Sequence, residues 1–427
     1  MTQLSQDCFA HGGNLIRLDE ALELMKCRLD VICSVETISI GKARGRVLAE
    51  DVIASRAVPP HTNSAVDGYA VYHSDLDPNG ETEFLIQSRV PAGHPLQGRV
   101  ERGQALRVFT GAMIPEGSDG IGPDTVIMQE DCRCLGTRVF VPPGVPKGAN
   151  MRPLGEDVAE GQVALASRRR IRTVDQAIAT AVGASRLHVY VRLKVALFST
   201  GDEVCEPGSD LGPGQIYDSN RIILSGFLRA LGCSVTDLGI LPDRLEDCRN
   251  AIATAAQSHD LLISSGGVSV GEEDHIRAAI LANGRVDFWR LAIKPGRPLA
   301  LGTIRTSDRV VPYLGLPGNP AAVVVTFMQF GRPLIMRLAG AEEPPPRFYP
   351  VLAGFSHQKK PNRREYLRCI LNSRSDGQLT AQKAGQQGAG ILSTVSAAEG
   401  LVELPEEMEY VAVGTTVQFL PFGEIGE

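Results

Sequence analysis

Three consecutive loops between residues 261 and 320 hold the residues best suited to chemistry. They combine acidic, basic and hydroxyl side chains with glycines and prolines. The candidate residues are Ser264, Gly266, Gly267, Asp274, Arg290, Lys294, Arg297, Pro317 and Pro320. Arginine and lysine fixed by a rigid proline turn can bind phosphate or another oxyanion, whereas a carboxylate can hold a hard cation such as Mg²⁺. The pattern predicts a polyanion site with room for a cation. A solvated basic run and a helix-capping Asp274 are the plain alternatives.

Each of these loops follows a short apolar run, at 261–265, 288–290 and 313–316. Runs this short, bounded by turn residues and alternating with helical patterns, are typical of strands buried in an α/β sheet. Ligands bind such sheets at the carboxyl ends of the strands, where the loops converge. We therefore expect the three loops to meet at one edge of a sheet.

An earlier loop fits the same pattern, because Thr200, Gly201 and Glu203 follow the apolar run 195–199. The glycine could let a ligand approach the backbone, and the Glu203 carboxylate could hold Mg²⁺. The alternative is an ordinary turn with a solvated glutamate. The position at a strand end favours the functional interpretation.

Two further aspartates stand between these loops. Asp218 precedes a helical pattern at 222–231, where it could cap the helix or mark free amides that hold a phosphate. Both interpretations can hold at once. Asp243 lies in a proline-bearing turn and is by default a turn residue.

Acidic turns also occur outside this region. Asp67 stands in an Asp-Gly turn, which could simply be a hairpin signal, and Asp157 closes the turn that follows Arg152. Spacing alone assigns neither of them a function. The chain has no Ser-His-Asp order, no nucleophile elbow, no Walker A lysine loop and no dinucleotide fingerprint. What remains is phosphate and oxyanion handling with a divalent cation, which does not determine a reaction.

Composition narrows the class of protein. A chain of 427 residues with 43% apolar and 22% charged residues is typical of an ordinary soluble protein of two to four domains. The formal charge of −6 argues against a general nucleic-acid binder. The sequence has no signal-peptide pattern and no apolar stretch near the roughly twenty residues of a membrane span, so we expect a cytoplasmic protein. Nine scattered cysteines predict free thiols, with Cys132 and Cys134 on a hairpin rather than around zinc.

The periodicity changes along the chain. Helical spacing covers about 14–52 and returns at 174–182, while short alternating runs at 59–143 indicate a small β domain inserted between two halves of a helical or linking domain. From residue 193, strand and helix patterns alternate up to a long helix at 320–338, which implies a mostly parallel sheet. A proline-rich linker and further short strands then suggest a small C-terminal β barrel or sandwich.

Eight short strings, taken together and in order, resemble the molybdopterin molybdenumtransferase family, which includes the MoeA-like enzymes and the gephyrin E domain. The strings are 63–70, 109–112, 155–157, 199–203, 214–218, 264–271, 294–296 and 316–320. The resemblance extends from about residue 14 to the C-terminus. One such string would be weak, whereas eight in order make the match specific.

The resemblance implies an α/β multidomain fold of four parts. These are a linking domain (14–53 with 149–190), an inserted β domain (54–148), a three-layer molybdopterin-binding α/β domain (191–340) and a C-terminal β-barrel-like domain (347–427). Family members are homodimers in which the α/β domain of one subunit and the inserted region of the other build the cleft.

The activity that the resemblance implies belongs to molybdenum cofactor biosynthesis. Molybdate is inserted into adenylylated molybdopterin and AMP is released, with Mg²⁺ assisting. A molybdopterin adenylyltransferase is the expected upstream partner, and neither nucleic acid nor a membrane is expected as a partner. Molybdenum and tungsten both remain open as the metal transferred.

Site residues follow from the matched strings. The implied catalytic residues are Asp67, Asp157, Glu203, Asp243, Asp274 and Lys294, of which Glu203, Asp243 and Asp274 would hold the Mg²⁺. The implied binding residues are Thr110, Arg152, Thr200, Gly201, Asp218, Ser264, Gly266, Gly267, Arg290, Arg297, Pro317 and Pro320. Asp67, Thr110, Arg152 and Asp157 would come from across the dimer.

The chain departs from the family's pattern at several positions, among them a short insertion at 120–124 and the pair at 153–154. Arg297 stands where lysine is usual, which keeps the charge but alters the donor geometry. Ala322 and Ala389 stand where serine is common. Both alanines remove hydroxyl donors from the expected molybdate pocket.

Two alternatives to the enzyme remain. A non-catalytic dimeric scaffold is one, because relatives of this fold also act as receptor-anchoring modules; the acidic and basic cleft residues count against it. A nicotinamide-nucleotide-processing relative sharing only the α/β domain is the other. It is disfavoured because the resemblance covers the flanking regions too.

Overall fold

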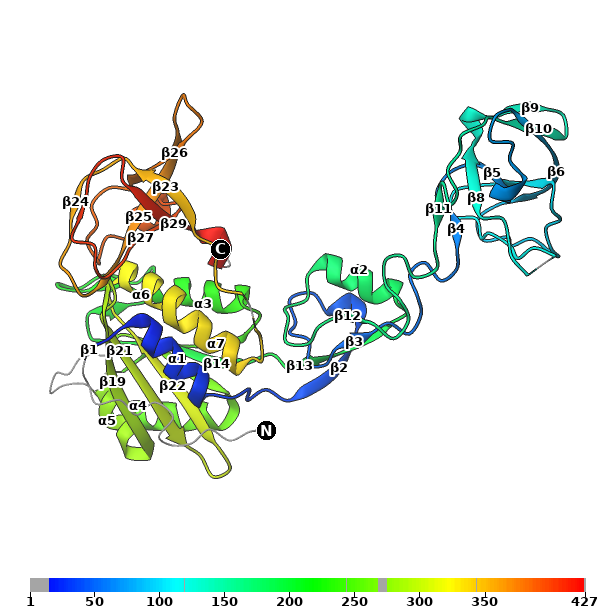
Figure 1. Cartoon of the computed structure of the whole chain (residues 1–427). Coiled ribbons are helices and arrows are strands. Elements are labelled where there is room, and N and C mark those ends of the chain that lie inside the picture. Colours follow the sequence, from blue (N-terminus) through cyan, green and yellow to red (C-terminus); the bar gives the residue numbers. More distant parts are fainter. Residues whose placement is uncertain (1–14, 119, 243, 268–274, 343, 426–427) are drawn as a thin grey trace.

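The structure is a computed structural model and describes residues 15–118, 120–242, 244–267, 275–342 and 344–425. Figure 1 shows the molecule drawn out along its length. The α/β region and the C-terminal strands lie at one end, the inserted β region lies at the other, and the elements around α2 (Thr173–Ala181) lie between them.

A seven-stranded sheet forms the α/β region, in the order β1-β19-β21-β22-β18-β14-β17. Its strands are β1 (Leu15–Ile16), β14 (Lys194–Thr200), β17 (Ser234–Leu241), β18 (Leu261–Ser265), β19 (Gly284–Leu291), β21 (Pro298–Arg305) and β22 (Val310–Leu316). Only β21 runs against the others. The prediction of a mostly parallel sheet is therefore confirmed, but the loop prediction around Arg297 missed β21, whose Pro298 resembles a turn residue.

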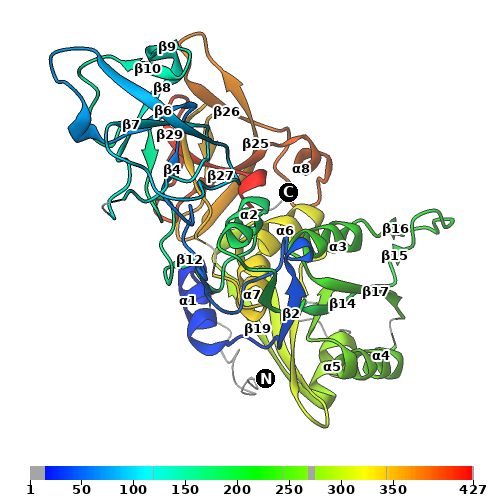
Figure 2. The same cartoon turned by 90° about the vertical axis from the view of Figure 1, so that its right-hand side faces the viewer.

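Helices cover both faces of this sheet. One face packs against α1 (Leu18–Arg28), α3 (Asn220–Ala230), α6 (Pro320–Thr326) and α7 (Arg332–Leu338), where Leu224 and Val323 meet Leu197 and Leu314. The other face packs against α4 (Leu245–Ser258) and α5 (His275–Asn283). Burial of each such side chain stabilises the fold by roughly 1.5–3 kcal/mol. The predicted three-layer domain is confirmed (Figure 2).

One helical run corrects an expectation from the sequence. Pro320–Leu338, in which a π-helical turn (Phe327–Gly331) joins α6 to α7, is long and apolar enough to cross a membrane by length and composition alone. Because 78% of this stretch is buried inside the protein, it forms a core helix of the α/β region. The apolar side chains of this stretch therefore pack against the sheet and not against lipid.

The linking region is mixed rather than helical at its start. Helix spans only 18–28 of the expected 14–52, because β2 (Val35–Ser39) pairs with β13 (Arg186–Tyr190). β3 (Val52–Ile53) likewise pairs with β12 (Val163–Leu165). The β-branched residues of β2 suit a strand, and its partner lies about 150 residues later, so local spacing could not reveal the pairing. The helix expected at 174–182 is α2.

The inserted region is a six-stranded sheet in the order β8-β5-β7-β6-β10-β9. Its strands are β5 (Gly68–Val71), β6 (Thr82–Val90), β7 (Gln104–Val108), β8 (Thr125–Met128), β9 (Arg133–Leu135) and β10 (Arg138–Val141). A small ribbon of β4 (Asn63–Ser64) and β11 (Met151–Arg152) leads into it. Cys134 lies on the expected hairpin, and the eight described cysteines are free thiols.

The C-terminal region is a closed five-stranded barrel, as predicted. Its strands are β23 (Tyr349–Ala353), β25 (Arg364–Ser373), β26 (Leu379–Lys383), β27 (Gly400–Leu404) and β29 (Thr416–Pro421). The pairing of β25 with β27 closes it. β20 (Ile293–Lys294), from the second of the three loops, adds to β25 and joins the barrel to the α/β region. The short elements β15 (Val204–Cys205), β16 (Ile216–Tyr217), β24 (His357–Gln358), β28 (Tyr410–Val411) and α8 (Ser393–Ala397) complete these regions.

Candidate functional site

The carboxyl ends of β14, β18 and β22 lie side by side. Ser199 pairs with Ser265, and Ser265 with Leu316, so the loops after these strands open at one edge of the sheet. A pocket of about 280 Å³ lies there, called the edge pocket below. Its lining is Ser199, Thr200, Glu203, Val204, Ile216, Tyr217, Asp218, Ser219, Asn220, Ser265, Gly266, Gly318, Asn319 and Pro320.

Glycine backbone conformations allow these loops to meet. Gly201 and Gly266 have φ angles of 128° and 87°, in the region that side chains rarely adopt. A Cβ on Gly266 would lie 3.1 Å from the carbonyl oxygen of Thr200. A Cβ on Gly201 would lie 2.5 Å from Glu203 Oε2, so the exposed carboxylate lies close over the glycine. Of the two glycines, Gly266 lines the edge pocket, and Gly201 lies next to the lining residue Thr200.

Asn220, at the start of α3, joins two neighbouring loops. Its Nδ2 donates to Ser265 Oγ at 2.9 Å and to the Gly318 carbonyl at 2.6 Å. Within the described part of the chain, its Oδ1 and the Oγ of Ser199 are buried and lack hydrogen-bond partners. Leaving such an atom unsatisfied costs roughly 1–3 kcal/mol. A ligand that pairs with these atoms would remove that cost.

Asp218 lines the edge pocket, but its carboxylate is already engaged. It accepts hydrogen bonds from the backbone N and the Nε of Arg221, both at 3.1 Å. The Arg221 guanidinium also reaches Asp237 and Glu206. Burial lowers the pKa of Arg221, but its hydrogen bond to Glu206 and the nearby carboxylates outweigh that effect and raise the pKa. Asp218 therefore fixes the start of α3 and contributes shape to the pocket.

Three predicted binding residues lie behind the pocket rather than on its wall. Ser264 Oγ lies 2.6 Å from the Tyr313 hydroxyl and donates to the Gly266 carbonyl, which turns this side chain into the sheet. Gly267, with φ of 64°, packs against Ile276. Pro317 is buried beneath the third loop.

The basic loop after β19 opens at the same edge, with β21 between it and β22. Lys294 Nζ lies 2.6 Å from Oε1 of Glu365, a barrel residue that is 1% exposed. Arg290 and Arg297 are exposed, and none of the three basic residues lines the edge pocket. The barrel therefore holds Lys294 in place beside the sheet edge.

The same glutamate contacts a histidine of the barrel. His357 Nε2 lies 3.1 Å from Glu365 Oε1. Burial lowers the pKa of His357 despite the opposing charge of Glu365. Lys294, Glu365 and His357 form one polar cluster between two regions of the chain.

Asp67 and Thr110 meet in the inserted region. Asp67 Oδ1 accepts hydrogen bonds from the backbone N and the Oγ1 of Thr110, both at 2.8 Å. These two donors lower the pKa of the Asp67 carboxyl, so it is charged at neutral pH. Two of the four residues that the resemblance assigns to the far side of the dimer thus form one pre-organised anionic group.

Arg152 lies in β11 and Asp157 in the bend that follows it, both in the segments leading to the same region. Arg152 Nε pairs with Glu156 Oε2 at 2.8 Å, and the Asp157 side chain is exposed. Figure 1 shows that the elements around α2 separate this part from the α/β edge. Within one chain, the two groups of predicted site residues therefore do not meet.

Two of the three predicted Mg²⁺ ligands, Asp243 and Asp274, lie outside the described residues. No cluster of three His, Cys, Asp or Glu side chains that could hold a metal occurs among the residues that are described. Glu203 is the described donor, and it is exposed beside Thr200. Thr200 pairs with Leu241, so the strand end before residue 243 lies next to the pocket.

Sequence reasoning missed three important residues. Asn220 follows Asp218 in the segment that the sequence predicts as a helix cap, although an asparagine at a strand-end loop is also a binding signal. Ser199 lies near the end of β14, and Glu365 lies 71 residues from its partner Lys294. No local pattern could have joined that last pair.

Comparison with known proteins gives matches along nearly the whole chain. Family models match at 16–183 (MoeA N-terminal region, domain I and II), 196–337 (probable molybdopterin binding domain) and 350–422 (MoeA C-terminal region, domain IV). The chain is 36% identical to the molybdopterin molybdenumtransferase of Haemophilus influenzae, over 96% of this chain and 100% of that protein. It is 34% identical to the Nostoc protein of the same name, over 92% and 90% of the two chains.

A solved structure gives the same result. The molybdopterin biosynthesis MoeA protein from Pyrococcus horikoshii superposes with a TM-score of 0.80 at 27% identity, covering 96% of this chain and 100% of that one. The chain therefore belongs to the family of molybdopterin molybdenumtransferases, the transferases of molybdenum cofactor biosynthesis.

Proposed function

We propose that this chain inserts molybdate into adenylylated molybdopterin and releases AMP. The observation that carries the proposal is the edge pocket. Its buried atoms Asn220 Oδ1 and Ser199 Oγ have no hydrogen-bond partner among the described residues, and a basic loop opens at the same edge of the sheet. In a balanced reaction, two Mo–S bonds form while one molybdate oxygen leaves with the two thiol protons as water. A water molecule hydrolyses the phosphoanhydride, which frees AMP.

The residues of the sheet edge would bind and orient the substrate. The polar wall of the edge pocket suits the hydrogen-bonding groups of a pterin or a phosphate. Lys294, Arg290 and Arg297 would draw in the anions, with Lys294 restrained by Glu365 at 2.6 Å. Because Glu365 fixes Lys294 before the substrate arrives, this lysine would stabilise charge without reorganising.

Mg²⁺ fits this scheme through carboxylate oxygens at the ends of neighbouring strands. Glu203, with Asp243 and Asp274, would hold it, and when bound it would neutralise charge on the pyrophosphate of the substrate. The exposed Glu203 carboxylate beside Thr200 supports this assignment.

A second copy of the chain would complete the site. Asp67 carries a fixed negative charge in the inserted region, yet it lies apart from the sheet edge within one chain. A homodimer that brings Asp67, Thr110, Arg152 and Asp157 of one subunit to the edge of the other explains both facts. We further propose a cytoplasmic enzyme supplied by a molybdopterin adenylyltransferase, with no nucleic-acid or membrane partner.

Turnover of the full-length protein tests the proposal directly. Adenylylated molybdopterin, Mg²⁺ and molybdate are supplied, and AMP is measured as molybdate and tungstate are titrated. We expect AMP release that requires one of these oxyanions. Absence of molybdate-dependent AMP release would contradict the transferase. A stable dimer that binds a peptide partner but not molybdopterin would favour a scaffold.

A further inference from the structure

A second pocket is separate from the edge pocket, and arginine is the commonest residue in its lining. It has a volume of about 740 Å³ and is called the arginine pocket here. Its lining is Arg44, Gly45, Arg169, Arg170, Ile171, Arg172, Thr173, Arg332, Glu342, Pro344, Pro345, Pro346, Arg347 and Glu424. It shares no lining residue with the edge pocket.

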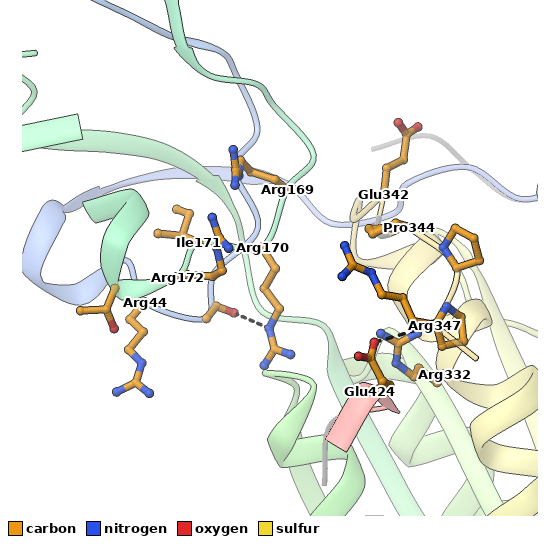
Figure 3. A pocket seen from close by; sticks show the side chains of 14 residues that line it. Arg44, Arg169, Arg170, Ile171, Arg172, Arg332, Glu342, Pro344, Arg347 and Glu424 are labelled. Carbon is orange, nitrogen blue, oxygen red and sulfur yellow. Dashed lines mark hydrogen bonds between the residues drawn. The ribbon is translucent and has the colours of Figure 1, made fainter. Parts of the chain in front are cut away.

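Three parts of the chain form its walls. Figure 3 shows Arg44, Arg169, Arg170 and Arg172 of the linking region on one side, facing Arg332 of α7 and Arg347 of the proline-rich linker. Residues this far apart in sequence come together only in the fold. Three of the six arginines come from the basic run at 169–172, and the fold adds Arg44, Arg332 and Arg347 to them.

The lining side chains carry six positive and two negative charges. Asp175, behind the wall, pairs with Arg169 at 3.0 Å and with Arg172 at 3.1 Å and offsets one further charge. Glu342 is already paired with Arg168, and Glu424 accepts from the Tyr349 hydroxyl at 3.1 Å. A substantial positive excess remains, and like charges in one pocket repel one another unless an anion joins them.

Several guanidinium groups remain available for a ligand. Among the described residues, Arg44 and Arg347 form no ion pair, and both are exposed. Arg170 donates to the carbonyl oxygens of Gly45 and Ala230, contacts that leave its charge uncompensated. Arg169 Nε is buried without a hydrogen-bond partner in the described part of the chain. These donors point to a ligand with several oxygen atoms and more than one negative charge.

We infer that the arginine pocket binds an oligophosphate, either a nucleoside polyphosphate or a free one such as pyrophosphate. Phosphate oxygens match the planar fork of arginine, and two or more phosphates are needed to reach guanidinium groups on opposing walls. The volume lies within the usual range for small-molecule pockets rather than for an extended groove. This site goes beyond the proposed transferase reaction and does not depend on it.

Binding would also connect parts of the molecule. The ligand would touch the linking region, α7 and the linker that precedes the barrel, so it would restrain the angle between them. The inserted region is carried by the linking region, as Figure 1 shows. An oligophosphate would therefore stiffen the chain at the point from which Asp67 is positioned.

Calorimetric titration of the full chain with pyrophosphate and, separately, with ATP tests the inference. The titrations are made in EDTA at about 0.15 M salt, so that divalent-cation binding at the sheet edge does not contribute. We expect one saturable event per chain at the arginine pocket, separate from any phosphate binding at the edge pocket. The double variant Arg44→Gln/Arg347→Gln should weaken it at least about tenfold, because two charge-assisted contacts are lost. Similar affinity for both probes indicates a free oligophosphate, and much tighter ATP binding indicates a nucleotide.

The matched control is Arg56→Gln/Arg374→Gln, which removes two exposed arginines that line neither pocket. It should bind both probes as the unaltered protein does. Absence of saturable binding, or equal binding by the pocket variant and the control, would overturn the inference. Tighter binding of hexaglutamate than of pyrophosphate, or a change of oligomeric state in the pocket variant alone, would instead assign this face to a protein contact.

Discussion

The edge pocket and the Asp67–Thr110 pair differ in how far the chain satisfies its own polar atoms. In the edge pocket, Asn220 Oδ1 and Ser199 Oγ are buried without partners in the described structure. In the inserted region, both donors of Thr110 already reach the Asp67 carboxylate. The edge pocket therefore has polar atoms that only a ligand could pair. Asp67 and Thr110, by contrast, are hydrogen-bonded to each other before any ligand arrives.

This difference suggests a division of labour. Unsatisfied atoms in a concave site favour binding, because the ligand replaces hydrogen bonds that the fold leaves unmade. A carboxylate held by two donors favours a fixed charge in a fixed place. We therefore expect changes at Asp67 to affect turnover most, and changes in the edge pocket to affect substrate affinity and stability.

The largest expected effect is that of Asp67→Asn. The neutral amide loses the charge that Thr110 holds in place, so turnover should fall by about a hundredfold or more while substrate affinity changes little. AMP release under saturating substrate measures it, with Asp131→Asn, an exposed carboxylate of the same region, as the control. Full turnover by the Asp67 variant would show that Asp67 of the inserted region takes no part in the active site.

The next largest effect should be that of Gly266→Ala. The new methyl group would lie 3.1 Å from the Thr200 carbonyl at a φ of 87°, which should destabilise the protein by roughly 1–3 kcal/mol and narrow the pocket. Gly226→Ala, in α3 with nothing within 4 Å, is the control and should stabilise by about 1 kcal/mol. Urea unfolding compares them. If the two variants had the same free energy of unfolding, the loop at Gly266 would accommodate the methyl group without a measurable cost.

A smaller effect is expected for Asn220→Ala, which removes the contacts to Ser265 and Gly318. The edge pocket should lose order and a ligand partner, so the KM for adenylylated molybdopterin should rise about tenfold with kcat nearly constant. Asn372→Ala, at an exposed position of the barrel, should leave both constants unchanged. A fall in kcat alone would assign Asn220 to the reaction itself and would break the contrast between the two surfaces.

Sequence patterns revealed one of these surfaces better than the other. The convergence of loops at the sheet edge follows from strand runs and topology rules, so the amino-acid sequence alone places residues such as Thr200 and Gly266 there. The prediction failed where pairing is long-range. β2 joins a strand about 150 residues away, and β21 contains Pro298 and Gly302, which resemble turn residues.

The contacts that define the second surface were beyond reach for the same reason. Asp67 and Thr110 are 43 residues apart, and each stands in a turn that has an ordinary structural explanation. Only the pairing of β5 with β7, in which Gly68 lies opposite Val108, brings them together. Lys294 and Glu365 illustrate the point again, since their contact joins two regions of the chain.

The finest test of the comparison is Thr110→Val, which removes one of the two donors to Asp67 and keeps the other. The hydrogen bonds lower the pKa of this carboxyl, so its charge, and the stability that the charge contributes, persist above the unfolded pKa and are lost as pH falls through the lower folded value. Losing the hydroxyl donor should raise that pKa and shift the acid limb of the pH–turnover profile to higher pH. Thr110→Ser keeps the hydroxyl and should restore the original limb. If valine and serine give the same profile, the Asp67 charge does not depend on its partner, and the inserted region is no more pre-organised than the edge pocket.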